Sequence, residues 1–177
     1  MKIKQDFPHR VREIENQWIT LADGTRLAAR IWLPKNAEAA PVPAILEYLP
    51  YRKRDGTAAR DELTHPWLAG HGYACVRVDM RGNGESDGLM EDEYAPQEQA
   101  DALEVIDWIA AQPWCSGKLG MMGISWGAST ACNWPRSDPN RSRRSSPCAP
   151  PTTATPTIST TRAATCCWRI WAGRRPC

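Results

Sequence analysis

An abrupt change in composition after Gly127 is the feature that most restricts how this chain can fold. From Ala128 to Cys177 there is no Leu, Val, Phe, Met or Tyr, and eight Arg face a single acidic residue, Asp138. A segment so poor in apolar side chains cannot bury enough area to offset its conformational entropy. The sequence therefore predicts a folded unit within residues 1–127 and a disordered, low-complexity tail over residues 128–177.

Residues 1–127 have the composition of a globular protein. They contain 14 Lys and Arg against 19 Asp and Glu, a net charge of −5, with aliphatic residues in periodic segments. No apolar run approaches the roughly 18 residues of a membrane span, and the N-terminus lacks the apolar core of a secretory signal, so we expect a cytoplasmic protein. The seven cysteines of the chain have no CxxC spacing. We therefore expect no disulfide framework, no metal site and no cofactor.

Strand-like and helix-like segments alternate along this first part. Two β-like runs flank Asp23-Gly24, a strong hairpin signal. Short apolar runs then predict buried strands, and amphipathic patterns between them predict helices. The strands are expected within residues 41–51, 73–80 and 117–125, and the helices within 61–72 and 95–114. This order predicts an α/β fold in which an antiparallel hairpin leads into a parallel sheet with helices on both faces.

A GxSxG motif, formed by Gly123, Ser125 and Gly127, ends the last predicted strand. A tight strand-to-helix turn of this kind exposes a serine hydroxyl to a base, and the close approach of strand and helix excludes side chains at both glycines. The turn also presents the backbone N–H of Trp126 to a developing oxyanion. The motif predicts that Ser125 is a nucleophile, and the alternative is a plain glycine-rich turn.

Four consecutive segments resemble blocks of the CocE/NonD serine hydrolases, relatives of X-prolyl dipeptidyl aminopeptidases and α-amino-acid ester hydrolases. They read ADGTRLAARIWLP, LEYLPYRKRD, VRVDMRGNGESDG and DWIAAQPWCSGKLGMMGISWG and fall within residues 16–127. The resemblance implies the N-terminal half of an α/β-hydrolase sheet and hydrolysis of esters, amides or peptides by Ser125. It also implies that the phenol of Tyr51 joins Trp126 N–H in the oxyanion hole. From the residues alone, Tyr51 suits a packed core or rim position.

The sequence shows no acid and no base that would complete a catalytic triad with Ser125. In the α/β-hydrolase order the acid and the histidine follow the serine, whereas His9, His65 and His71 all precede it. We expect His65 and His71 to be ordinary surface or capping residues near one helix. The loop RGNGES lacks the third glycine of a phosphate-binding fingerprint, so we expect it to be structural. The chain as given is therefore predicted to be inactive or nearly so.

The tail has a specific candidate explanation. If one base is missing after codon 127, the neighbouring frame can encode an apolar helix followed by the strand KAIVTV, the pair of elements expected after GISWG. We therefore hypothesise that residues 128–177 are translated out of frame, and a genuine low-complexity tail is the alternative. Without that strand, the strand leading to Ser125 would lie at an unpaired sheet edge.

Two other classes of function stay open. The tail carries a net charge of +7 and could hold nucleic acid, but it has neither clustered lysines nor a recognisable fold, so we expect no nucleic-acid partner. A pseudoenzyme scaffold could instead bind a small molecule through the same half-site, with Ser125 as an inert turn residue.

Overall fold

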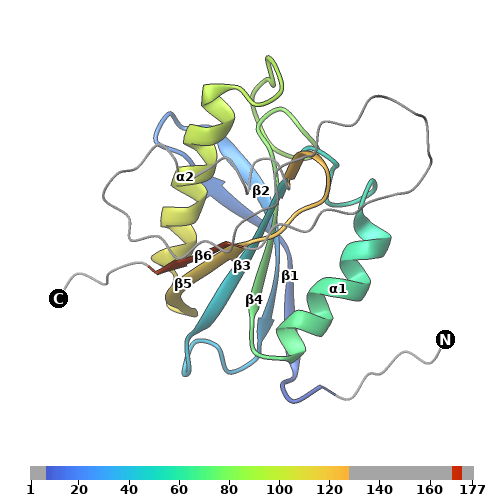
Figure 1. Cartoon of the computed structure of the whole chain (residues 1–177), viewed down its shortest axis with the longest axis vertical. Coiled ribbons are helices and arrows are strands. Elements are labelled where there is room, and N and C mark those ends of the chain that lie inside the picture. Colours follow the sequence, from blue (N-terminus) through green and yellow to red (C-terminus); the bar gives the residue numbers. More distant parts are fainter. Residues whose placement is uncertain (1–6, 128–168, 173–177) are drawn as a thin grey trace, which may run out of the picture.

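The computed structural model describes residues 7–127 and 169–172, and Figure 1 shows a single twisted sheet with one helix against each face. The six strands lie in the order β1-β2-β4-β3-β5-β6. The elements are β1 (Val11–Thr20), β2 (Arg26–Pro34), β3 (Val42–Leu49), α1 (Ala58–Gly70), β4 (Ala74–Asp79), α2 (Pro96–Ala110), β5 (Cys115–Met121) and β6 (Arg169–Ala172).

The strand directions confirm the predicted α/β class. β1 and β2 form the antiparallel hairpin, and β3 pairs in parallel with both β4 and β5. At the hairpin turn Gly24 has a φ of +85°, and the N–H of Thr25 donates to the carboxylate of Asp23 at 2.9 Å. The side-chain acceptor and the left-handed glycine are the two features that made this turn predictable.

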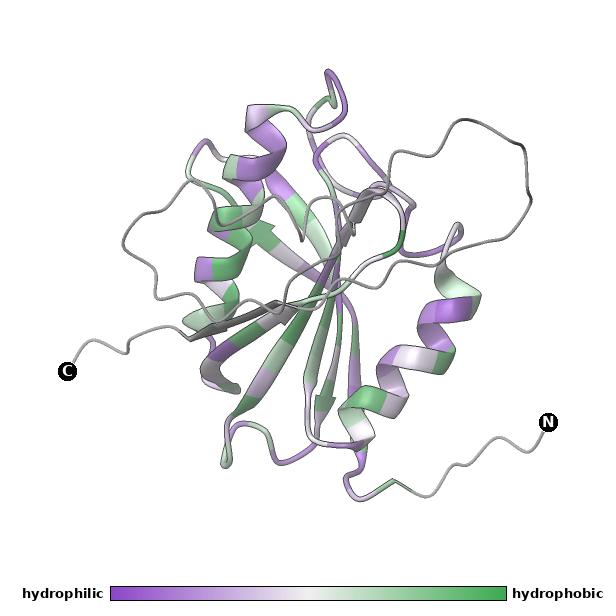
Figure 2. Cartoon of the chain, viewed as in Figure 1, coloured by the Kyte–Doolittle hydropathy of each residue, from purple (hydrophilic) through white to green (hydrophobic). Residues whose placement is uncertain are grey.

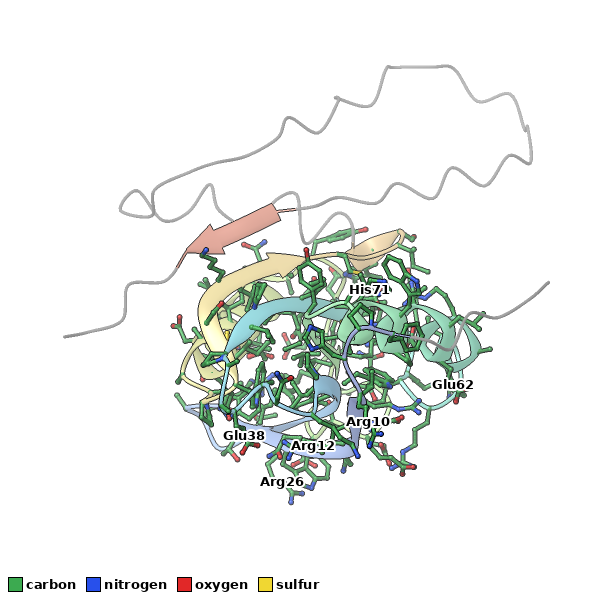
Figure 3. All side chains as sticks on the ribbon, turned by 90° about the horizontal axis from the view of Figure 1, so that it is seen from below. Arg10, Arg12, Arg26, Glu38, Glu62 and His71 are labelled. Carbon is green, nitrogen blue, oxygen red and sulfur yellow. The ribbon has the colours of Figure 1, made fainter. Side chains whose placement is uncertain are left out.

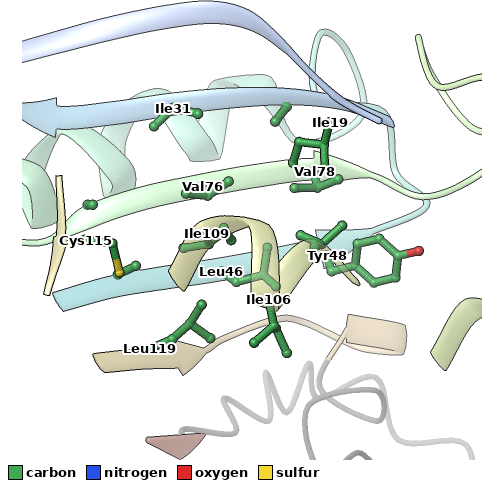
Figure 4. Close-up of a cluster of buried hydrophobic side chains, with 14 of the residues drawn as sticks. Ile19, Ile31, Leu46, Tyr48, Val76, Val78, Ile106, Ile109, Cys115 and Leu119 are labelled. Atoms are coloured by element: carbon green, nitrogen blue, oxygen red, sulfur yellow. The ribbon is translucent and has the colours of Figure 1, made fainter. Parts of the chain in front are cut away.

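The core lies on both faces of the central strands. Every residue of β4 is buried, as expected for a strand covered on both sides. Leu46, Val76 and Ile109 belong to the cluster between the sheet and α2 (Figure 4). A smaller cluster under α1 includes Trp32 and Cys75. In Figure 2 the hydrophobic residues accordingly gather along the central strands.

The prediction that β5 forms a free edge of the sheet is wrong. We expected β5 to have a free edge, but β6 pairs with it antiparallel, with Lys118 opposite Ala172 and Met121 opposite Arg169. β6 has only four residues, too few for an alternating pattern to indicate a strand, which is why the composition of the tail did not reveal it. The rest of the predicted tail, and the frameshift hypothesis with it, lies outside the described residues. Neither described helix has the length and apolar character needed to cross a lipid bilayer.

The two histidines of α1 differ from each other. His71 is at the C-cap, where its Nδ1 lies 2.7 Å from the carbonyl of Trp67, in agreement with the capping role expected of it. His65 is fully buried, contrary to prediction, and its ring lies 4.7 Å from that of Trp32. The prediction failed because α1 turns polar side chains, not only apolar ones, toward the sheet.

Candidate active site

Ser125 occupies a sharp turn just beyond the end of β5. Its φ is +52°, which residues with a side chain rarely adopt, and the N–H of Gly127 donates to the carbonyl of Ile124 at 3.1 Å across the turn. A left-handed residue of this kind costs about 1–2 kcal/mol and persists only where its surroundings fix it. The turn leaves the serine exposed to solvent at the carboxyl end of the parallel strands.

The two glycines of the motif pack as closely as the spacing predicts. A Cβ placed on Gly123 would lie 2.6 Å from the backbone carbon of Gly127. A Cβ on Gly127 would overlap the buried side chain of Leu49 at the end of β3. The backbone on either side of Ser125 therefore has no room for a side chain, which fixes the serine in its strained conformation.

Replacing Gly123 by Ala is expected to lower the free energy of unfolding by about 1–3 kcal/mol, because the added methyl group meets backbone that cannot move independently. Urea denaturation followed by tryptophan fluorescence measures the change. Gly24→Asn is the matched control, since no atom lies within 4 Å of a Cβ there and Asn tolerates a positive φ. An equal loss in both variants would contradict the packing argument.

Tyr51 and Trp126, the two predicted oxyanion-hole residues, lie together. The backbone N–H of Trp126 donates to the hydroxyl of Tyr51 at 3.4 Å, across 75 positions of sequence. Tyr51 follows β3 and Trp126 follows the serine, so the two groups meet because β3 and β5 are neighbouring parallel strands. The hydroxyl of Tyr51 and the backbone N–H of Trp126 thus lie next to each other, one residue beyond Ser125.

The loop after β3 that carries Tyr51 is held by the end of β4. Asp79 accepts the backbone N–H of Lys53 at 2.7 Å and that of Glu85 at 3.3 Å, and the Lys53 ammonium pairs with Glu85. Burial raises the pKa of the Asp79 carboxyl, while the charge of Arg77 opposes this shift. The RGNGES loop, which includes Glu85, therefore supports the tyrosine loop, which agrees with the structural role expected of it.

The indole of Trp126 is fixed by residues that the sequence did not point out. Its Nε1–H donates to the carboxylate of Glu98, at 3.1 and 3.2 Å from the two oxygens, and its ring lies 5.2 Å from that of Tyr94. Glu98 also accepts the backbone N–H of Tyr94 at 3.0 Å. An acidic residue in the first turn of a helix is common, so Glu98 gave no signal in the sequence.

A cavity of about 300 Å³ opens beside this arrangement, between the ends of β3 and β4 and the start of α2. Glu98 belongs to its wall, which connects the cavity to Trp126. The wall is acidic, and its one arginine, Arg81, is already held by Asp101 at 2.7 Å and by Asp23 at 2.8 Å. Other residues of the wall are Tyr48, Met80, Leu89, Met90, Glu91 and Asp92.

No histidine of the described segment 7–127 lies at the serine. His65 is buried under α1, where its Nε2 is 3.3 Å from the carboxylate of Glu47. His71 caps the far end of α1, and His9 donates its backbone N–H to Gly70 at that same end. The sequence prediction that these histidines are not the catalytic base is consistent with their positions.

Glu47, Asp61 and His65 form the one group of metal-ligand type found within the described residues. Arginines already balance the charges of the two carboxylates. Arg60 contacts both Glu47 and Asp61 at 2.5 Å, and the Nε of Arg77 lies 3.3 Å from Asp61. The donor set therefore suits an ion-pair network better than a metal ion, which would have to displace two guanidinium groups.

Comparison with protein families places these features in context. Residues 23–163 match the X-Pro dipeptidyl-peptidase family, S15, a range that includes the whole GxSxG motif and runs beyond Gly127. Among curated relatives, a protein of Mycobacterium bovis named as a serine esterase is 33% identical over 130 residues, covering 64% of this chain and 21% of the relative. The cocaine esterase of a Rhodococcus species is 38% identical over 115 residues, covering 63% of this chain and 19% of that enzyme.

Solved structures show the same fold. A CocE/NonD family hydrolase from Staphylococcus aureus superposes with a TM-score of 0.58 at 24% identity, over 67% of this chain and 24% of that one. An α-amino acid ester hydrolase gives a TM-score of 0.54 at 25% identity, over 73% of this chain and 24% of the other. The chain thus has the α/β-hydrolase fold and spans about a fifth of the length of the curated relatives, 21% for the mycobacterial protein.

Proposed function

The chain belongs to the X-Pro dipeptidyl-peptidase family, S15, and from that membership we propose that it carries the nucleophile half of a serine hydrolase site for esters, amides or peptides. In this proposal Ser125 attacks the acyl carbonyl, and Tyr51 O–H and Trp126 N–H donate to the resulting oxyanion. The oxyanion then collapses with cleavage of the ester or amide bond, the alcohol or amine leaves with the proton that Ser125 gave up, and water hydrolyses the acyl-enzyme on Ser125 to release the acid.

The observation that carries the proposal is the distance of 3.4 Å between Trp126 N and the Tyr51 hydroxyl, beside a serine held at a φ of +52°. The two groups lie close enough for both to donate to one oxyanion once it replaces the hydrogen bond between them, and each such donor is worth about 10²- to 10³-fold in rate. An inert glycine-rich turn needs neither the strained serine nor a phenol brought from another strand.

The cavity beside Trp126 is the proposed place for one side of the substrate. It lies at the carboxyl ends of parallel strands, where α/β folds usually bind ligands, and Glu98 links its wall to the oxyanion-hole residue Trp126. Its volume of about 300 Å³ suits the acyl or leaving group of a small ester or amide.

We propose further that the chain as given is inactive or nearly so in turnover. The proton of Ser125 needs a base, and the described histidines all lie elsewhere. Removing the triad in a serine protease costs on the order of a million-fold in turnover. The proposed cause is that residues 128–177 are translated out of frame, so that the acid and the histidine of the family are not encoded.

Labelling with a fluorophosphonate tests the nucleophile without requiring turnover. We expect slow, stoichiometric modification, seen as one added phosphonyl group by intact-protein mass spectrometry, and no modification of Ser125→Ala. In Tyr51→Phe the labelling rate is expected to fall by about 10²-fold, because the phosphonyl oxygen loses one donor. Tyr73→Phe, an exposed tyrosine that precedes β4, is the matched control.

The outcomes separate the proposed function from its main alternative. Labelling that persists in Ser125→Ala would move the nucleophile elsewhere. A folded protein that is never labelled would instead favour a non-catalytic scaffold, with Ser125 as a turn residue.

A further inference from the structure

A second pocket, of about 370 Å³, lies at the end of the sheet opposite the serine. Val11 pairs with Pro34 there, and Ala74 begins β4 at the same end, whereas Ser125 follows the other end of the parallel strands. The pocket, which we term the basic pocket, is lined by Phe7, His9, Arg10, Val11, Lys35 and Pro66. It is therefore separate from the proposed catalytic half-site.

Arg10 of the basic pocket differs from the other arginines of segment 7–127 because no carboxylate of that segment forms an ion pair with it. Each of the others forms an ion pair within 4.0 Å: Arg12, Arg26, Arg30, Arg52, Arg54, Arg60, Arg77 and Arg81. Lys35, which also lines the pocket, likewise has no ion pair within that segment. Two cations therefore face one hollow with no anion supplied by the described residues.

The walls of the basic pocket are held by backbone contacts. His9 N–H donates to the carbonyl of Gly70 at 3.0 Å, and Lys35 N–H donates to the carbonyl of Arg10 at 2.8 Å. Phe7 packs directly on Gly70, where an added Cβ would overlap its ring, and contacts His71 edge to face at 5.9 Å. The backbone that carries the two cations and the aromatic wall are thus fixed before any ligand arrives.

The end of α1 does not already use these cations. Its last carbonyls accept backbone N–H groups: Ala69 accepts from Gly72, Leu68 from His71 and Tyr73, and Gly70 from His9. The negative end of the helix is therefore satisfied by the main chain. The charges of Arg10 and Lys35 are left to act on the pocket.

We propose that the basic pocket binds a small amphipathic anion, a phosphate or carboxylate group carried on an apolar stem. The anionic oxygens would accept from the guanidinium of Arg10 and the ammonium of Lys35, and the stem would lie against Phe7 and Pro66. A guanidinium pairs with such oxygens through two parallel hydrogen bonds, which gives the site its preference for anions.

Calorimetric titration of the full chain at low ionic strength tests this, with phenyl phosphate, benzoate, inorganic phosphate and phenol as separate probes. We expect phenyl phosphate or benzoate to bind at least about tenfold more tightly than inorganic phosphate, and phenol not to bind. Whichever of the two aryl anions binds more tightly identifies the preferred anionic group. Affinity is expected to fall with added salt, because the cations are near the surface.

Matched variants locate the binding. The double variant Arg10→Gln/Lys35→Gln is expected to lose at least about tenfold in affinity, whereas Arg12→Gln is expected to lose none. Arg12 lies two positions after Arg10 and is paired with Glu38 at 2.8 Å (Figure 3). Its replacement by Gln therefore changes the net charge of the protein but not the lining of the pocket. Ser125→Ala should bind normally, which separates this site from the proposed hydrolase site.

Three results would overturn the proposal. They are equal losses in Arg12→Gln and in the double variant, equal affinities for inorganic and phenyl phosphate, and no binding of either aryl anion at millimolar concentration by a chain with native circular dichroism. The first would mean general charge attraction, the second would remove the role of the apolar wall, and the third would remove the site.

Discussion

Restoring the alternative reading frame after codon 127, and translating through to its own stop codon, is expected to raise turnover of an activated acyl ester by about 10⁴- to 10⁶-fold. The gain is expected because the present chain offers a strained serine and the two proposed oxyanion donors, Tyr51 and Trp126, but no histidine at Ser125 within residues 7–127. The restored frame should supply the acid and the base. Initial rates with a p-nitrophenyl ester measure the difference.

The restored protein should also differ at one edge of the sheet. In the present chain β6 pairs antiparallel with β5, over Lys118–Met121. The strand KAIVTV of the alternative frame would follow a helix and so return parallel to β5. Ser125→Ala in the restored protein is the control and should abolish the gain. A restored protein that folds but gains nothing would show that the tail is not a frameshifted copy of the family's sequence.

Replacing Arg77 by Met is expected to lower the free energy of unfolding by about 3–5 kcal/mol, the largest stability effect that we predict for a single substitution. Arg77 is fully buried, with its Nε 3.3 Å from Asp61 and its Nη1 3.7 Å from Asp79. Its Nη1 also donates to the carbonyl of Val78 at 2.7 Å. Methionine fills much of the same volume but removes the Arg77 charge from two buried carboxylates, of which Asp61 keeps its contact with Arg60.

The loss should depend on pH, and its sign follows from the carboxylates. Burial raises the pKa of Asp79, and Arg77 is the main interaction that lowers it, so the variant raises this pKa further. A carboxyl with a raised pKa in the folded state stabilises most when protonated and loses that contribution as pH rises. The destabilisation should therefore grow between about pH 4 and pH 7.

Urea denaturation at several pH values measures both effects. Arg52→Met is the matched control, because its pair with Asp55 is exposed and such pairs contribute about 0–1 kcal/mol. A pH-independent loss in Arg77→Met would mean that packing, and not uncompensated charge, accounts for the destabilisation.

The sequence was informative wherever a local pattern has one structural solution. The Asp23-Gly24 turn and the spacing of Gly123 and Gly127 each follow from backbone geometry that few residues satisfy. The strand and helix order, and with it the α/β fold, came from these patterns. His65 was misjudged because the burial of a polar ring leaves no hydrophobic pattern, and β6 because four residues are too few to show a period.

By itself, then, the sequence determined that a serine would lie on a tight turn after a strand of an α/β sheet. The reason is that only glycine fits two residues before this serine and two residues after it. Only the tertiary structure decided which distant groups meet that turn. Tyr51 reaches Trp126 because β3 and β5 are adjacent, and Glu98 reaches the indole because α2 packs across the same strands. Such contacts depend on how elements pack in space, and no local pattern of residues encodes that packing.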